Sequence, residues 1–124
     1  KEQSSLVDKQ KLKRILSMPI FAGLDGYKLY KEQPFTVNIS AKELLDIDTD
    51  RQILVQGIID LLAVKDGNAV IVDYKHSTIL HGKDLIKKYE KQLRLYKTAV
   101  EKVLKLKVNE CYLVNIYTLK TVKV

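Results

Sequence analysis

Asp60, Asp73 and Lys75 are charged residues within or beside two strongly apolar stretches, residues 52–64 and 69–72. Two carboxylates that face each other across apolar strands repel and destabilise the fold. A divalent cation between them removes the repulsion, and Mg²⁺ prefers hard oxygen ligands, commonly one or two carboxylates besides water and phosphate oxygens. The pattern therefore points to a metal site.

Lys75 follows Asp73 by two residues, and the period of a strand places both side chains on one face. Such a group suits hydrolysis of a phosphodiester by water, because a cation neutralises the phosphate and acidifies the water while the lysine orients or deprotonates the nucleophile. The alternative is that both aspartates lie at strand ends, protonated or in solvent, with Lys75 as an ion-pair partner.

The choice depends on the register of one hairpin. Asp66 and Gly67 lie between the two apolar stretches, and an Asp-Gly pair in that position predicts a tight turn. A two-residue or four-residue loop places Asp60 opposite Asp73, with Cβ atoms about 4.5–5.5 Å apart. A three-residue loop shifts the register by one and puts the aspartates on opposite faces.

Apolar periodicity predicts the elements that position this hairpin. The run at residues 52–64 is nearly continuous, which predicts a strand covered on both faces. The other expected elements are a helix at 5–17, a turn-rich connection at 21–27, a strand at 30–39, a short helix capped by Ser40 and Glu43, a long helix at 85–105, and strands at 111–117 and 121–124.

Composition narrows the class of protein. The 124 residues are 46% hydrophobic and 30% charged, which fits one globular domain. No apolar run reaches the roughly 18 residues of a membrane span and no signal peptide pattern is present, so we expect a cytoplasmic protein. The single cysteine, Cys111, excludes an internal disulfide and a cysteine-based metal site. The net charge of +7 favours an acidic polymer, nucleic acid first, as partner.

Three ordered segments carry a recognisable pattern. They are Gln56-Gly57-Ile58-Ile59-Asp60, Ile71-Val72-Asp73-Tyr74-Lys75 and Tyr89-Glu90-Lys91-Gln92-Leu93-Arg94-Leu95-Tyr96. Together they resemble the RecB-like branch of the PD-(D/E)XK nucleases, and within it the AddA group of helicase–nuclease subunits. Residues 31–35 resemble the segment that precedes the core sheet in that group.

The resemblance implies an α/β domain with a central mixed β-sheet flanked by α-helices, the restriction-endonuclease-like core. Asp60 and Asp73 are then metal-ligating carboxylates, and Lys75 is the lysine of the signature. The main-chain carbonyl of Tyr74 completes the protein's share of a shell for Mg²⁺, which Mn²⁺ can replace.

The third segment matches the glutamine and tyrosine motif of the family through Gln92 and Tyr96, on a helix beside the active site. The alternative for Tyr89 and Tyr96 is ordinary core packing. An amide such as Gln92 on an apolar helix face needs hydrogen-bond partners, which favours a functional role.

Two features depart from the family pattern. Ile59 stands where the general signature has proline. No histidine precedes Pro19, although family members carry a metal-ligating histidine or acidic residue on an upstream helix, and both His76 and His81 follow the signature lysine. Weak metal binding and slow cleavage are therefore expected if that helix lies outside this sequence. Glu32 is a substitute ligand or, alternatively, part of the strand-entry segment.

Lys87, Lys91 and Arg94 lie along the outer side of the long helix. Such a face is ordinarily just solvated, but the net charge and the nuclease motif predict that it shares in binding DNA phosphates.

We therefore expect one domain over residues 1–124, with a helical lead-in at 1–29 and a nuclease core at 30–124, as a piece of a larger helicase–nuclease. The expected function is Mg²⁺-dependent hydrolysis of DNA in double-strand-break repair and recombination. The expected partners are DNA, a helicase portion that binds ATP, and a second, AddB-like subunit. The alternatives are an inactive nuclease-fold module that binds DNA or serves structurally, and a basic interaction domain whose carboxylates only form ion pairs.

Overall fold

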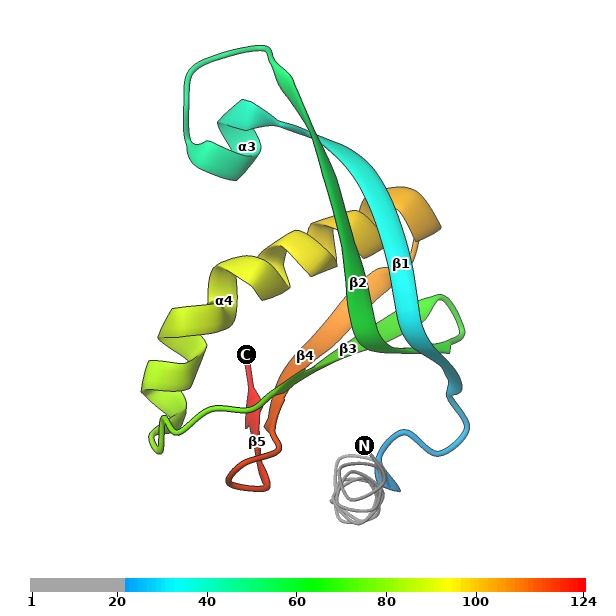
Figure 1. The fold of residues 1–124 in the computed structure, drawn as a ribbon. Helices are drawn as coiled ribbons and strands as arrows, with labels where there is room; N and C mark the ends of the chain where they lie inside the picture. Colours follow the sequence, from blue (N-terminus) through cyan, green and yellow to red (C-terminus); the bar gives the residue numbers. More distant parts are fainter. Residues whose placement is uncertain (1–21) are drawn as a thin grey trace, which may run out of the picture.

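A computed structural model describes residues 22–124 (Figure 1). Its five strands form one sheet in the order β1-β2-β3-β4-β5, in which β3 and β4 run parallel and the other neighbours antiparallel. This confirms the predicted α/β class with a central mixed sheet and flanking helices. The elements are β1 (Lys28–Ser40), α3 (Ala41–Leu45), β2 (Gln52–Lys65), β3 (Asn68–Lys75), α4 (Gly82–Ala99), the π-helical turn η1 (Val100–Leu104), β4 (Lys107–Asn115) and β5 (Lys120–Lys123).

The β2–β3 hairpin has the register predicted from the Asp-Gly pair. Asp66 and Gly67 have φ values of 51° and 79°, the two left-handed positions that a type I′ turn needs. Leu61 pairs with Val72, and the ladder continues to Lys65 at the turn. The next positions beyond Leu61 and Val72 are Asp60 and Asp73, so the register with a three-residue loop is excluded.

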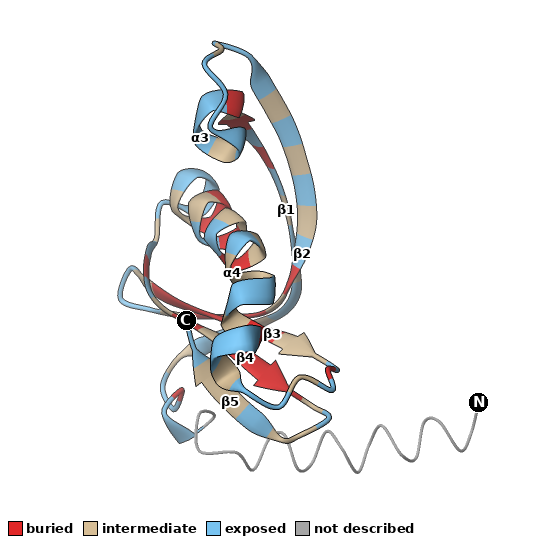
Figure 2. Cartoon of the chain, turned by 90° about the vertical axis from the view of Figure 1, so that its left-hand side faces the viewer, coloured by how far each residue is buried: buried red, intermediate tan, exposed pale blue. Residues whose placement is uncertain are grey.

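The first half of β2 corrects one prediction. Residues 52–58 alternate between exposed and half-buried positions, and the outward-facing Leu54 and Ile58 are 59% and 56% exposed (Figure 2). The expectation of a strand covered on both faces is wrong there, because β3 is much shorter than β2 and pairs only with its second half. β1 and β2 continue past β3 as a two-stranded arm that reaches α3 (Figure 1).

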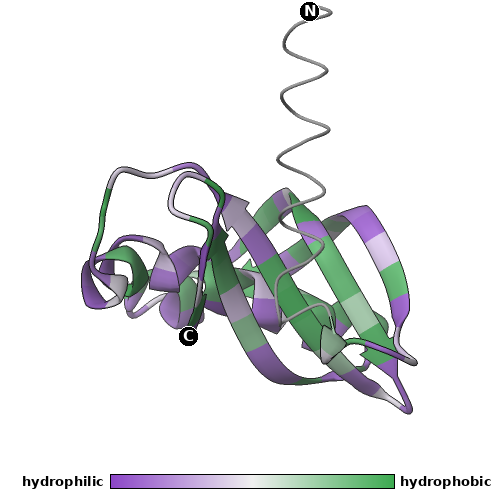
Figure 3. Ribbon diagram, turned by 90° about the horizontal axis from the view of Figure 1, so that it is seen from below, coloured by the Kyte–Doolittle hydropathy of each residue, from purple (hydrophilic) through white to green (hydrophobic). Residues whose placement is uncertain are grey.

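The predicted long helix begins earlier and ends differently than expected. α4 starts at Gly82, three residues before the predicted start, and the chain becomes π-helical at Val100 before Lys105, with φ of 56°, ends it. Its buried stripe, which includes Leu85, Leu93 and Tyr96, packs against hydrophobic residues of the sheet, whose strands carry both hydrophobic and hydrophilic residues (Figure 3). The expected helix at 5–17 lies outside the described residues.

Smaller predictions are confirmed in part. The Ser40 Oγ accepts a hydrogen bond from the Glu43 N–H at 3.1 Å, but the Glu43 carboxylate contacts Lys102 at 3.2 Å, so only half of a capping box forms. β4 begins at Lys107, four residues before its predicted start. Among residues 22–124 no helix is long and apolar enough to cross a membrane.

Candidate active site

Asp73 lies near the end of β3 and is only 2% exposed. The ammonium of Lys75, two residues further along the strand, lies 3.0 Å from the Asp73 Oδ2. This contact lacks the angles of a hydrogen bond, and no other donor reaches this buried oxygen. Asp73 therefore offers a carboxylate oxygen that is charge-paired but still able to accept a ligand.

Asp60 lies on the same face of the sheet, because it precedes Leu62 by two residues and Leu62 packs beneath α4. Ile59 and Leu62 are three residues apart and yet pack into one cluster beneath α4, whereas Leu61 packs on the opposite face. Residues three apart share a face only where the two-residue period is interrupted. The half-buried Asp60 then accepts a hydrogen bond from the Tyr74 N–H at 2.8 Å, which fixes its carboxylate beside Asp73.

Asp60 and Asp73, hereafter the carboxylate pair, are poorly suited to carry two negative charges. Burial first, and then the neighbouring Asp60 carboxylate, raise the pKa of Asp73 to about 6, against an opposing effect of Lys75. The raised pKa agrees with the repulsion between the two carboxylates that the sequence predicts. A bound proton or cation relieves this repulsion and so stabilises the pair.

Side chains of helix α4, which packs on the sheet, contact the ammonium group of Lys75. Lys75 Nζ donates to the Gln92 Oε1 at 2.7 Å, and the Gln92 Nε2 donates to the Tyr96 hydroxyl at 3.0 Å. The ring of Tyr89 lies under the same ammonium, with its centroid 4.7 Å away. Burial, followed by the charges of Asp73 and Asp60, raises the pKa of Tyr96, so its hydroxyl stays protonated. The structure thus brings every predicted catalytic side chain into one cluster.

The donor set fits a hard divalent cation. Asp60 and Asp73 provide adjacent carboxylates, and the buried Asp73 Oδ2 lacks a hydrogen-bond donor. Within residues 22–124 no group of three or more His, Cys, Asp and Glu side chains could hold a metal ion. Mg²⁺ commonly takes only one or two carboxylates and fills its shell with water and phosphate oxygens, so two are sufficient.

Asn115 is a supporting residue that the sequence analysis missed. It is 1% exposed at the end of β4, opposite Lys75 in the parallel ladder. Its side chain accepts from the Ser77 N–H at 3.2 Å and the Tyr117 N–H at 3.0 Å, and donates to the Ser77 carbonyl at 3.0 Å. These bonds fix the chain directly after Lys75. The only signal in the sequence is a polar residue that follows the apolar run Leu113-Val114.

We expect Asn115→Ala to lower the free energy of unfolding by about 2–4 kcal/mol, because the substitution leaves buried main-chain groups without partners. Asn109→Ala, on an exposed position of the same strand, is the matched control and is expected to change stability by less than about 0.5 kcal/mol. Urea unfolding of both variants measures the difference. Equal stability of the two variants would contradict this assignment.

The predicted DNA-binding residues and the histidines lie outside the cluster. Lys87, Lys91 and Arg94 are exposed on α4. The Arg94 guanidinium lies 3.9 Å from the Glu90 carboxylate. Lys91 and Arg94 also line a hollow of about 530 Å³ between α3 and α4. Two acidic residues at the end of α3, Glu43 and Asp46, line the same hollow. His76 packs edge-on against the Tyr117 ring at 5.2 Å, and His81 precedes α4.

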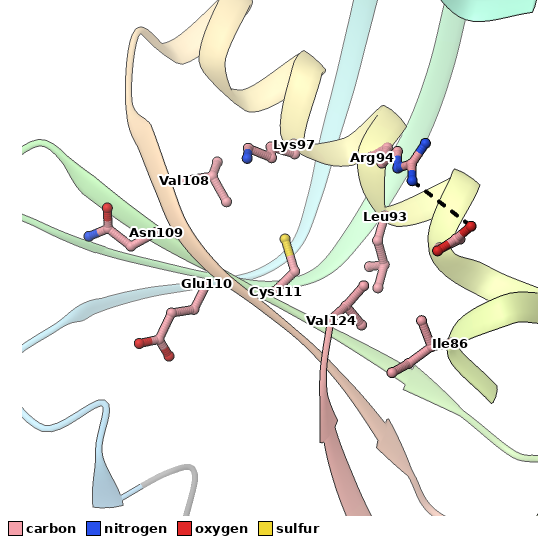
Figure 4. A pocket seen from close by; sticks show the side chains of 10 residues that line it. Ile86, Leu93, Arg94, Lys97, Val108, Asn109, Glu110, Cys111 and Val124 are labelled. Carbon is pink, nitrogen blue, oxygen red and sulfur yellow. Dashed lines mark ion pairs between the residues drawn. The ribbon is translucent and has the colours of Figure 1, made fainter. Parts of the chain in front are cut away.

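A second hollow, of about 330 Å³, lies between α4 and β4 (Figure 4). The Cys111 thiol points into it toward α4, with Lys97 and Arg94 at its rim. Burial raises the pKa of Cys111, so the thiol stays protonated, as expected for a small buried strand residue. The hollow contains no member of the carboxylate pair.

The fold and the cluster of side chains around the carboxylate pair together define a class of protein. A mixed sheet carries two acidic residues and a lysine on adjacent strands, and a helix supports the lysine through a glutamine and a tyrosine. The sequence model of the PD-(D/E)XK nuclease superfamily matches residues 3–123. The chain therefore belongs to that superfamily.

Two individual proteins similar to this chain narrow its position within the superfamily. It is 34% identical over 118 residues to the A subunit of the ATP-dependent helicase/nuclease of Alkaliphilus oremlandii, a match that covers 90% of this chain and 10% of the relative. It is 36% identical over 128 residues to the corresponding protein of Carboxydothermus hydrogenoformans, which covers 99% of this chain and 11% of the relative. The chain spans about a tenth of the length of these relatives.

Proposed function

We propose that the chain is a metal-dependent nuclease domain that hydrolyses DNA phosphodiesters, with Mg²⁺ as cofactor and Mn²⁺ as a substitute. The observation that carries the proposal is the buried Asp73 carboxylate, which lies beside the Asp60 carboxylate and has its Oδ2 3.0 Å from the Lys75 ammonium. The Lys75 ammonium offsets only one of the two negative charges, whereas a divalent cation between the carboxylates offsets both.

Each residue of the cluster has its own role. Asp60 and Asp73 hold the cation, together with the main-chain carbonyl of Tyr74. A bound divalent cation neutralises charge on the phosphate and acidifies the attacking water. Lys75 lies at the edge of the carboxylate pair, where its ammonium can orient the nucleophile or stabilise the developing negative charge.

Gln92 and Tyr96 act through Lys75. The Gln92 amide accepts from the lysine and donates to the Tyr96 hydroxyl, so it fixes the direction of the ammonium. A fixed ammonium needs little reorganisation when charge develops on the phosphate, which is the source of electrostatic catalysis.

DNA binding and assembly extend this proposal. Lys87, Lys91 and Arg94 add to the positive field of the α4 surface and attract the phosphate backbone. The names of the relatives support a setting in a larger ATP-dependent helicase–nuclease. The role that we propose for that assembly is double-strand-break repair and recombination. The partners in that setting are a helicase portion and a second, AddB-like subunit.

A second candidate function is a nuclease-fold module that binds DNA without cleaving it. The observation that favours it is the small ligand set, since the described residues 22–124 bring only two carboxylates together.

Cleavage of end-labelled single- and double-stranded DNA by the full chain tests the proposal, with Mg²⁺, with Mn²⁺ and with EDTA. Cutting that needs either cation and stops with EDTA is expected. DNA binding without cation-dependent cutting would favour the inactive module, and cutting in EDTA would contradict the metal site.

A further inference from the structure

One aromatic ring next to the carboxylate pair contacts two ammonium groups. The ring centroid of Tyr89 lies 4.7 Å from the Lys75 Nζ and 5.2 Å from the Lys88 Nζ. An aromatic ring attracts cations electrostatically through its face. The two ammonium nitrogens therefore lie within about 10 Å of each other, given these two distances.

The ammonium groups of Lys75 and Lys88 differ in their hydrogen-bond and ion-pair partners within the protein. The side chain of Lys75 is 18% exposed and contacts Asp73 and Gln92. Lys88 is exposed, and no carboxylate of residues 22–124 lies within ion-pair distance of it. Lys88 thus presents an uncompensated positive charge at the edge of the site.

Helix geometry distinguishes Lys88 from Lys91 and Arg94, two other basic residues of α4. Lys88 precedes Gln92 by four residues, so both side chains lie on the same side of the helix. Lys91 and Arg94, in contrast, lie near the acidic side chains of the α3 end and of Glu90.

We propose that Lys88 binds a DNA phosphate adjacent to the one at the carboxylate pair, and that Tyr89 is the positioning residue that holds both ammonium groups. This inference rests on the proposed nuclease function. The phosphate is recognised by charge, so the contact is independent of base sequence. The DNA strand then passes over the middle of α4, near Lys88 and Gln92.

The first test measures binding of a fluorescent single-stranded oligonucleotide by anisotropy in EDTA, so that no cleavage occurs. Lys88→Gln is expected to raise Kd about tenfold at low salt and to reduce the slope of log Kd against log salt by about one. Lys97→Gln removes the same charge from the flank of α4 beside Cys111 and is expected to change Kd by less than twofold.

The second test separates positioning from packing. Tyr89→Leu keeps an apolar side chain but removes the ring, and we expect it to raise Kd as Lys88→Gln does and to lower kcat about tenfold. Tyr89→Phe keeps the ring and is expected to retain both values within twofold.

Other outcomes overturn the inference in distinguishable ways. If the wild-type chain binds and cuts DNA but Lys88→Gln and Lys97→Gln have equal effects, the positive field alone explains binding and the Lys88 contact is wrong. Equal kcat for Tyr89→Leu and Tyr89→Phe removes the role of the ring. A wild-type chain that neither binds nor cuts DNA overturns the proposed function as well.

Discussion

Asp73→Asn is expected to reduce the rate of cation-dependent DNA cleavage at least about a thousandfold, a loss of about 4 kcal/mol in transition-state stabilisation. The substitution keeps the shape of the side chain but removes the charge that binds the cation, and the amide cannot replace the buried Oδ2 as an anionic ligand. Initial rates on an end-labelled duplex, at saturating Mg²⁺, measure the effect. Retention of more than a tenth of the wild-type rate would contradict the assignment.

The stability of the same variant provides its control, measured on metal-free protein in EDTA. The pKa of Asp73 is about 6 in the folded state and 3.8 for the ordinary side chain. The folded state therefore binds more protons than the unfolded state between these values, so stability falls as pH rises from about 4 to about 6, by up to about 3 kcal/mol. Asp73→Asn cannot ionise and is expected to lose this part of the pH dependence while it stays folded at pH 7.

Lys75→Met is expected to lower kcat by about 10²–10⁴, the usual contribution of a group that moves or orients a proton in the transition state. Methionine keeps an unbranched apolar stem beside Gln92 and Tyr89 but has no ammonium. The free energy of unfolding serves as the control for folding, and single-turnover cleavage is the measurement.

Comparison of the two variants separates their roles. Lys75→Met is expected to keep a Mn²⁺ site because both carboxylates remain, whereas Asp73→Asn is expected to lose it. An equal loss of Mn²⁺ binding in both variants would show that Lys75 supports the metal site itself, contrary to the role proposed here.

The hairpin and its register could be predicted from the sequence because both depend on local chemistry. Asp66 and Gly67 tolerate the left-handed conformations of a type I′ turn, and the turn then fixes every pair along the ladder up to Leu61 and Val72, the neighbours of Asp60 and Asp73. The period of α4 likewise predicted that Gln92 and Tyr96 share a face. Their hydrogen bond at 3.0 Å agrees with that spacing.

Tertiary features could not be predicted in the same way. The exposure of Leu54 and Ile58 depends on the length of β3, which no residue of β2 encodes. The break in alternation between Ile59 and Asp60 lies where the β1–β2 pairing skips Glu32, whose φ is 49°. Asn115 lies 40 residues after Lys75 in the sequence and meets the lysine strand only through the parallel pairing of β3 and β4.

The most direct test of the central claim is a titration of the full chain with Mn²⁺, followed by the electron paramagnetic resonance signal of the free ion. Saturable Mn²⁺ binding that Asp73→Asn abolishes and Lys97→Gln leaves intact is the result predicted here. A chain that binds no Mn²⁺, or an Asp73→Asn variant that binds it as the wild type does, would contradict a metal site at the carboxylate pair.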